Sequence, residues 1–201
     1  MVFCQSRPLD LWTLDLYIDG RRQRLKALLL VETRSYAVAR RVALALGYSI
    51  LMGLLARVSL PLPFTPVPVT GQTLGVLLAG VLLGGPLAAS AMILYLAEGA
   101  MGLPVFSPAG PGGLAQLLGP TGGFLLGYPL AAFVVGSLCR RGNRLAGVLA
   151  GEALIFAFGA AWLWMLLHLP AARLFQAAVL PFLPGEVLKV ALVLAIARRW
   201  R

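Results

Sequence analysis

Glu186 and Lys189 place a carboxylate and an ammonium group in an apolar stretch that runs from about Ala177 to Ala197. About 20 apolar residues of helix cross the hydrocarbon core of a bilayer, so this stretch is long enough to span one. A charge inside such a span costs about 2.5 to 3.5 kcal/mol on insertion scales, and chains rarely keep one without a partner or a function. Residues three apart share one face of a helix, so the two groups lie close enough to pair with each other or to contact the same third group.

Two interpretations of this pair are open. Glu186 and Lys189 either satisfy each other and fix only the packing of helices, or they present an acceptor and a donor to a third group. We take the second interpretation, a polar ligand site inside a membrane protein, as the working hypothesis.

The composition indicates an integral membrane protein. Of the 201 residues, 60% are hydrophobic and only 12% are charged, and the mean hydropathy is +0.88, far outside the averages of soluble domains. The net charge of +10 comes from basic residues clustered between apolar runs and at the termini, a pattern typical of membrane topology rather than of nucleic-acid binding. Two distant cysteines, Cys4 and Cys139, and one histidine, His168, indicate neither a disulfide framework nor a metal site.

Six apolar segments predict an all-α integral membrane protein with six transmembrane helices. They span approximately residues 42–60, 71–83, 86–103, 121–138, 145–169 and 177–197. The stretches 61–70 and 104–120 are rich in proline and form long loops, because proline excludes a regular helix and stiffens the backbone. The second segment is short for a full span, so it either sits behind a loop that dips into the protein or borrows its first turn from that loop.

The basic residues orient these segments. Three clusters precede the first segment, separate the fourth from the fifth and follow the sixth: Arg34, Arg40 and Arg41; Arg140, Arg141 and Arg144; Arg198, Arg199 and Arg201. The opposite loops carry only Arg57 and Arg173, which we expect to snorkel to the outer headgroups. By the positive-inside rule, both termini are cytoplasmic in a multi-pass protein of the cell membrane, and the two long loops face outward.

Residues 1–41 are predicted to be an N-terminal extension, separate from a membrane domain over residues 42–201. The extension holds eight of the 17 basic residues and four of the seven acids. Alternation around Asp19-Gly20 is typical of a β-hairpin; a poorly ordered extension or a wrongly chosen start codon is equally open. The apolar run from Ala27 to Val31 is too short for a signal peptide.

Small residues recur every four positions along several segments. The first such stripe is Ala39, Ala43 and Gly47; others include Gly80 with Gly84 and Gly147 with Gly151. In lipid, such faces allow helix backbones to approach closely. Most stripes pack helices within one chain, and the first stripe is either such a face or a docking surface for another membrane subunit.

Four motifs occur in order along the membrane part of the chain. They are Pro66-Val67-Pro68-Val69-Thr70-Gly71-Gln72-Thr73-Leu74; Tyr95-Leu96 with Gly99 and Gly102-Leu103-Pro104-Val105-Phe106; Gly119-Pro120-Thr121-Gly122-Gly123-Phe124; and Pro184-Gly185-Glu186 with Lys189. With them, the chain from about Val42 to Arg201 resembles the BioY family, the biotin-binding S-components of energy-coupling factor (ECF) transporters. The family usually has Asp where this chain has Glu186, whose carboxylate reaches one methylene further.

The resemblance implies a membrane-embedded subunit that captures biotin from the outside and delivers it through an ATP-driven complex. The partners implied are a transmembrane coupling subunit, docked at Ala39, Ala43 and Gly47, and two cytoplasmic ATP-binding subunits. The chain has no G-x-x-x-x-G-K-[ST] motif, so ATP hydrolysis belongs to the partners, and neither enzymatic activity nor a resident cofactor is expected. An S-component for another vitamin, or a biotin transporter that acts without the ATPase module, is the alternative.

Biotin's chemistry then assigns the site residues. Its ureido group offers one carbonyl acceptor and two N–H donors, which suit Lys189 and Glu186. Apolar and aromatic walls are expected around the rest of the ligand, with Phe64, Tyr95, Phe106, Phe124 and Tyr128 as candidates. The vitamin's carboxylate would meet backbone N–H groups or Thr70, Gln72 and Thr121, and the stiff stretch 61–70 would form a lid or rim.

Two further glutamates need a separate interpretation. Glu98, near the outer end of the third segment, either rims the pocket or reaches interfacial water. Glu152, a third of the way into the fifth segment, is expected to bond to another helix or to pair with Arg140 or Arg141 rather than to serve transport chemistry. An intramembrane hydrolase is disfavoured, since Ser49, Ser90 and His168 show no arrangement of nucleophile and base, and the segments lack the polar rings of a channel.

Overall fold

The computed structural model describes residues 35–199. The chain divides into two compact units, residues 1–42 and residues 43–201. Of the first unit only residues 35–42 are described; they are helical and exposed, and they begin the helix Ser35–Arg57. The extension predicted over residues 1–41 therefore lies largely outside the described residues, as does Cys4.

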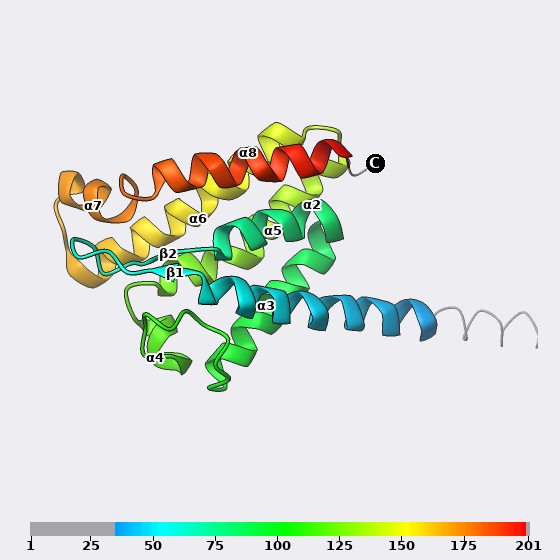
Figure 1. The fold of residues 1–201 in the computed structure, drawn as a ribbon, viewed down its shortest axis with the longest axis horizontal. Helices are drawn as coiled ribbons and strands as arrows, with labels where there is room; N and C mark the ends of the chain where they lie inside the picture. Colours follow the sequence, from blue (N-terminus) through cyan, green and yellow to red (C-terminus); the bar gives the residue numbers. More distant parts are fainter. Residues whose placement is uncertain (1–34, 200–201) are drawn as a thin grey trace, which may run out of the picture. The chain divides into compact units, whose positions relative to one another are not determined.

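The second unit is built almost entirely of helices (Figure 1). After the helix Ser35–Arg57 the elements are β1 (Ser59–Leu60), β2 (Val69–Thr70), α2 (Gln72–Leu83), α3 (Gly85–Ala100), α4 (Gly113–Leu118), α5 (Gly122–Arg140), α6 (Arg144–Leu167), α7 (Ala171–Ala178) and α8 (Leu183–Arg199). The two short strands pair antiparallel, with Ser59 opposite Thr70 and Leu60 opposite Val69. The predicted all-helical architecture is confirmed.

Four stretches of the described chain qualify as membrane spans by length and composition. Three are single helices, namely Ser35–Arg57, α5 and α6, and the fourth is the pair α7 and α8, which is bent by 52°. The helix α2 has 12 residues and α3 has 16, so each is shorter than the roughly 20 residues of a full span. A membrane protein with several helical spans is thus supported, and six full spans remain a prediction.

The last apolar segment was predicted as one helix over residues 177–197, and that prediction is wrong. The chain leaves the helix after Ala178 and enters α8 only at Leu183. Pro181 lies in the break and Pro184 in the first turn of α8, the one part of a helix where proline's missing N–H costs no hydrogen bond. As a result Glu186 lies in the first turn of α8, not in the middle of a span.

The first and third loops also differ from the prediction. The first helix ends at Arg57, and residues 59–60 leave it as β1 rather than extending it to residue 60. The helix α4 interrupts the stretch 104–120, which was predicted to be loop throughout. These changes leave the order of the apolar segments intact.

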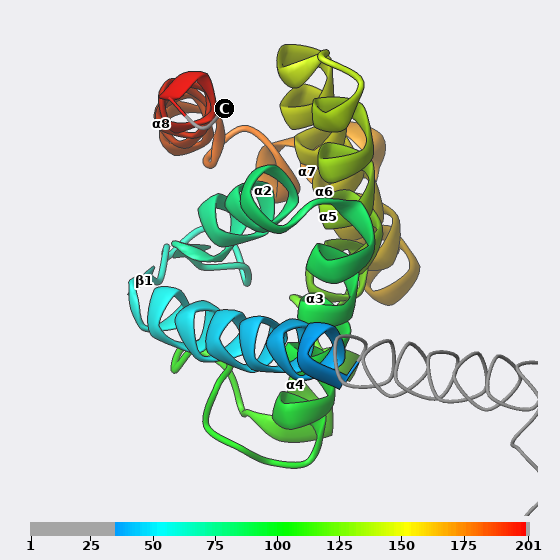
Figure 2. The same ribbon diagram turned by 90° about the vertical axis from the view of Figure 1, so that its right-hand side faces the viewer.

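The helix α5 forms the centre of the packing. It contacts α2, α3 and α6, while α2 also packs on α8. Figure 2, in which α8 is seen end-on, shows α2 beside α8, and α5 and α6 running together. Glycines make these approaches possible: a Cβ at Gly136 would lie 2.7 Å from the Cα of Gly85, and one at Gly80 would lie 2.9 Å from the carbonyl oxygen of Ala132.

The stripe of Ala39, Ala43 and Gly47 behaves differently. All three residues are exposed, and a Cβ at Gly47 would meet no atom within 4 Å. Gly47 therefore has no close neighbour in the described part of the second unit, unlike Gly80, Gly136 and Gly151.

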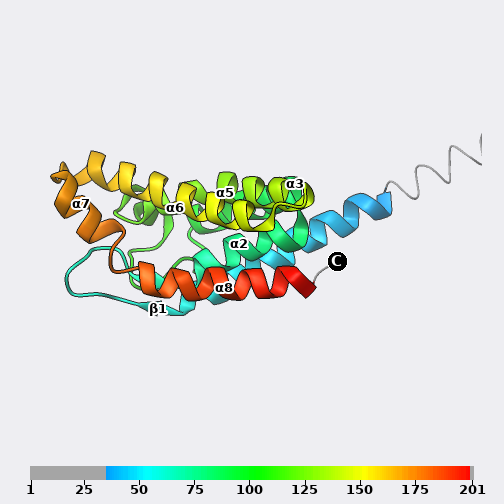
Figure 3. The same cartoon turned by 90° about the horizontal axis from the view of Figure 1, so that it is seen from above.

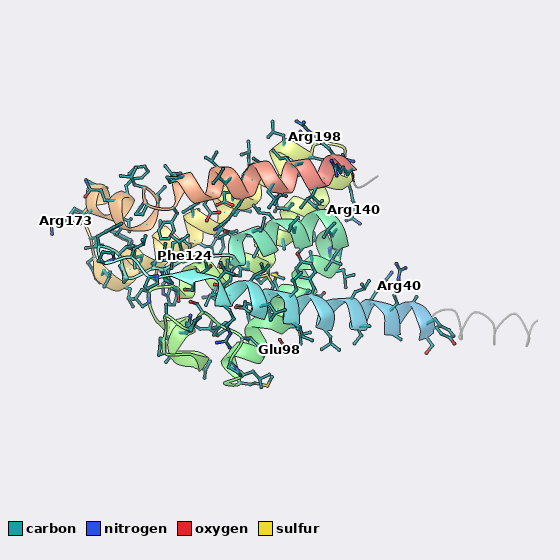
Figure 4. The ribbon with its side chains drawn as sticks, viewed as in Figure 1. Arg40, Glu98, Phe124, Arg140, Arg173 and Arg198 are labelled. Atoms are coloured by element: carbon teal, nitrogen blue, oxygen red, sulfur yellow. The ribbon has the colours of Figure 1, made fainter. Side chains whose placement is uncertain are left out.

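The ends of the second unit carry different features. Figures 1 and 3 place α7 and the loop between β1 and β2 at one end. Figure 4 shows Arg173 at that end and Arg140 and Arg198 at the other.

We expect Gly136→Ala to destabilise the protein, because its new methyl group would collide with the backbone of Gly84 and Gly85. Overpacking of this kind costs about 1 to 3 kcal/mol. Thermal unfolding of the purified protein in detergent measures it. Gly47→Ala is the matched control, since its methyl group enters open space and alanine favours helix. Equal unfolding temperatures for the two variants would contradict this account of the packing.

Candidate ligand-binding site

A cavity lies between the chain around β2 and the helices α2, α5, α6 and α8. Its empty volume is about 500 Å³ with the open mouth included. It is lined by Val67, Pro68, Thr70, Gln72, Thr73, Ser107, Gln116, Thr121, Phe124, Leu125, Tyr128, Ile155, Phe156, Phe182 and Glu186. Mostly apolar walls with a few convergent polar groups are typical of small-molecule sites.

An ion pair organises what we call the polar end of the cavity, formed by Thr70, Thr73, Glu186 and Lys189. The Lys189 Nζ lies 2.7 Å from Glu186 Oε1. It also donates to the carbonyl oxygen of Thr70 at 2.6 Å and to Thr73 Oγ1 at 2.8 Å. The Thr73 hydroxyl lies 3.0 Å and 2.8 Å from the two carboxylate oxygens of Glu186. Residues more than 110 positions apart thus form one network.

The two charged residues face the cavity differently. An ammonium group has three N–H donors, and all three of Lys189 are used by Thr70, Thr73 and Glu186. Lys189 does not line the cavity, whereas Glu186 does. A ligand would therefore meet the Glu186 carboxylate directly, and Lys189 could reach it only by giving up one of these bonds.

A second hydrogen-bond chain holds the neighbouring wall. The Thr70 hydroxyl lies 3.0 Å from Gln72 Oε1, and Gln72 Nε2 donates to the Tyr95 hydroxyl at 2.6 Å. That hydroxyl donates to the carbonyl oxygen of Val105 at 3.0 Å. Phe106 packs edge-on against the Tyr95 ring, with centroids 5.4 Å apart. This chain fixes the position of Gln72, which lines the cavity.

Aromatic rings form a further part of the cavity wall. Phe124, Phe156 and Phe182 come from three helices or their ends, and their ring centroids lie 6.3 to 6.4 Å apart. Phe124 lies near the middle of the unit in Figure 4. The Phe124 ring packs directly on Gly159 of α6, where a Cβ would collide with it. Such a wall suits a flat or aliphatic ligand.

The stretch 61–68 partly covers the cavity. Val67 and Pro68 belong to its lining. The Thr65 hydroxyl, which is buried, donates to the carbonyl oxygen of Ala177 in α7 at 2.7 Å. This bond ties the proline-rich loop to the bent segment that leads into α8.

The structure brings some of the predicted residues to the cavity and leaves others behind it. Glu186, Thr70, Gln72, Thr121, Phe124 and Tyr128 line it, whereas Lys189, Tyr95 and Phe106 do not. Tyr95 and Phe106 are buried behind the wall that Gln72 forms. Phe64, predicted as a wall, is 67% exposed and does not line the cavity.

Several lining residues were not predicted from the sequence. Thr73 belongs to the first of the four sequence motifs, between Gln72 and Leu74, and that position could have identified it. Gln116 lies in a glycine-rich stretch without any pattern, although its side chain is 2% exposed and its Oε1 accepts from the Gly112 N–H. Phe156 and Phe182 were indistinguishable from ordinary apolar positions.

The two remaining glutamates have clearly different surroundings. Glu98 accepts a hydrogen bond from Ser49 Oγ at 3.0 Å and does not line the cavity. Glu152 is 8% exposed, and within the described residues neither of its carboxyl oxygens has a hydrogen-bond partner. The predicted pair with Arg140 or Arg141 is therefore wrong, and the acidic group on another helix with which Glu152 interacts is Glu186 of α8.

Fold and cavity together define the class: a helical membrane protein with an open cavity between its helices, lined mainly by apolar side chains and by the Glu186 carboxylate. The sequence profile of the BioY family matches residues 24–201, and the chain belongs to that family. The match starts ahead of residue 42, where the membrane domain was predicted to begin; that domain boundary stays a prediction.

Individual proteins show the same similarity. A relative from Pyrococcus horikoshii, named a probable biotin transporter BioY, is 35% identical over 161 residues, which cover 80% of this chain and 96% of the relative. A biotin transporter BioY from Rhizobium etli is 37% identical over 169 residues, covering 78% and 88%. The crystal structure of the S-component for biotin from an ECF-type ABC transporter matches with a TM-score of 0.74 at 27% identity, covering 82% of this chain and 92% of that one.

We expect Thr73→Val to lower the stability of the protein by about 1.5 to 3 kcal/mol, the usual contribution of hydrogen bonds to charged groups. The variant removes the hydroxyl that bonds to both Lys189 and Glu186 while keeping the volume of the side chain. Thermal unfolding in detergent measures the loss. Ser90→Ala is the control, because it deletes an exposed hydroxyl that bonds only to the carbonyl oxygen of Pro86. A loss no larger than that of the control would show that Thr73 is dispensable to the ion pair.

Proposed function

We propose that this protein is a membrane-embedded substrate-binding component for biotin uptake. The observation that carries the proposal is the Glu186 carboxylate, paired with Lys189 and presented to a cavity that is otherwise largely apolar. Relatives that share most of the chain's length are named biotin transporters, and the matching crystal structure is that of an S-component for biotin.

The cavity suits the two ends of the vitamin. Biotin's ureido N–H groups donate to Glu186, the acceptor that faces the cavity. The ureido carbonyl accepts from Lys189 once that side chain releases the carbonyl oxygen of Thr70, its one neutral backbone partner. The thiophane ring and valeryl chain lie against Phe124, Phe156 and Phe182, and the carboxylate meets Gln116 or Thr121 further along the lining.

We further propose that biotin enters from the outside of a cell membrane and that both termini are cytoplasmic. Arg140 and Arg198 lie at the end of the second unit opposite Arg173 (Figure 4), and basic clusters favour the cytoplasmic side. The loop that borders the cavity then lies on the outer side, with α7 (Figure 1). In this arrangement α2 and α3, although short, complete six helical segments with the four candidate spans.

The energy source proposed is a separate ATP-driven module, reached through a transmembrane coupling subunit and two ATP-binding subunits. The stripe of Ala39, Ala43 and Gly47 supports a docking role, because its small residues are exposed and allow close approach of a second helix, and the space beside Gly47 is open. Transport of a different vitamin, and biotin transport without that module, are the competing functions.

Lys189→Met is expected to lower biotin affinity at least tenfold. It removes the countercharge of Glu186 and leaves a buried acceptor unpaired, at a cost of about 1 to 3 kcal/mol or more. Binding of radiolabelled biotin to the purified protein, with other vitamins as competitors, measures affinity and specificity together. Glu186→Asp keeps the charge and should retain binding. Unchanged affinity in Lys189→Met would overturn the site, and displacement of the label by another vitamin at lower concentration would overturn the choice of ligand.

Gly47→Trp should reduce co-purification with the coupling subunit and ATP-dependent uptake, while biotin binding by the isolated protein persists. The added indole blocks the close approach on which association of helices in lipid depends. Val38→Trp serves as the control, because Val38 is also exposed but lies nine residues before Gly47, about 180° from it around the same helix. Normal assembly of Gly47→Trp would refute the docking surface, whereas equal losses in both variants would mean that the surface is not confined to the stripe.

A further inference from the structure

Glu152 is a buried carboxyl group that the proposed binding mode does not use. It lies on α6, three and four residues before Ile155 and Phe156, which both line the cavity. This spacing puts all three on one face of the helix. The Glu152 side chain is 8% exposed. Within residues 35–199, its two carboxyl oxygens are buried and have no hydrogen-bond partner.

The charged groups around Glu152 leave it without a countercharge. Glu186 and Lys189 of α8 interact with it electrostatically, as does Tyr128 of α5. Lys189 already bonds to Glu186, Thr70 and Thr73. Two carboxyl groups therefore share one ammonium group.

The other elements that pack on α6 add no nearby cation. The helix α2 contains no titratable side chain. The arginines of α7 and α5, Arg173 and Arg140, lie at opposite ends of the unit in Figure 4. The arginine that begins α6, Arg144, is eight residues away, about 12 Å along the helix. No ion pair with Glu152 is formed in the described chain.

An ionised Glu152 would thus be a second, uncompensated negative charge in the membrane interior. Burying an isolated carboxylate costs tens of kcal/mol in the continuum limit, and in practice the group takes up a proton instead. Where two carboxyl groups share a site, one of them keeps its proton. Glu186 has the ammonium partner and the Thr73 hydroxyl, so the proton belongs to Glu152.

We propose that Glu152 is a proton-binding site linked to ligand binding, and that the protein binds its ligand with Glu152 protonated. This inference rests on the proposed function in one respect, namely that Glu186 and Lys189 contact the ligand. A deprotonated Glu152 competes for the hydrogen bonds of Lys189 and draws it away from Glu186. Ligand affinity therefore falls as Glu152 loses its proton, and by linkage the loaded protein holds the proton more tightly.

The first test measures the proton without any ligand. Infrared spectra of the purified protein at neutral pH should contain the C=O stretching band of a protonated carboxylic acid, and Glu152→Gln should lose it. Glu98→Gln is the matched control, because Glu98 is partly exposed and bonds to Ser49; it should keep the band. Absence of the band from the wild type, or its persistence in Glu152→Gln, overturns the proposal whatever ligand the protein binds.

The second test measures the linkage with biotin as the probe. Wild-type affinity should fall with rising alkaline pH by up to about tenfold per pH unit, the limit for one linked proton. In that range calorimetry in buffers of different ionisation enthalpy should detect uptake of up to one proton per biotin. Glu152→Gln should flatten the pH profile and abolish the uptake. Should Glu152→Gln fail to fold, the wild-type calorimetry decides alone, and zero proton uptake overturns the linkage.

The experiments distinguish failure of the proposed function from failure of the proposed proton linkage. No biotin binding by the wild type at any pH refutes the proposed function, while the infrared result still decides whether Glu152 holds a proton. Biotin binding with the same pH dependence in wild type and Glu152→Gln refutes the linkage and leaves the proposed function standing.

Discussion

The ion pair of Glu186 and Lys189 imposes the strictest requirement on this structure, because both side chains are largely buried and most of their hydrogen bonds must be made within the chain. One carboxylate acceptor leaves two ammonium donors unsatisfied, and each unsatisfied polar group costs several kcal/mol in hydrocarbon. The chain supplies the carbonyl oxygen of Thr70 and the hydroxyl of Thr73. The start of α2 must therefore lie against the first turn of α8, and these contacts set the position of the polar end.

That requirement explains why α2 is short. A carbonyl inside a helix is used by the N–H four residues on, whereas Thr70 lies in β2, one residue before the helix cap, and its carbonyl oxygen is free for Lys189. Non-helical backbone at membrane depth is tolerated where it lines a cavity, and Thr70 does so. The prolines of residues 61–68 keep this segment out of helix, and the bond from Thr65 to Ala177 holds it in place.

The sequence predicted the features that depend on the spacing of apolar and small residues and on the positions of charged residues. The apolar segments, the close approaches at Gly80 and Gly151 and the polar pair follow from local sequence patterns, whereas the approach of Gly136 to Gly85 was not predicted. Prediction was poorer for side chains whose positions depend on long-range contacts. The Tyr95 ring lies behind the cavity wall because its hydroxyl accepts from Gln72, 23 residues away. No residue close to Tyr95 in the sequence indicates this position. The break before α8 was an avoidable error, since Pro181 and Pro184 mark it.

The length of the Glu186 side chain connects the two carboxyl groups. The BioY resemblance implies Asp as the usual residue at this position, and an aspartate carboxylate would lie about one C–C bond, roughly 1.5 Å, closer to the backbone of α8. The extra methylene carries both oxygens to within 3.0 Å of the Thr73 hydroxyl and into the surroundings of Glu152 on α6. Because two like charges that share a site are costly, the longer side chain favours the neutral Glu152 that we propose, and in that proposal the two glutamates and Lys189 form one electrostatic unit.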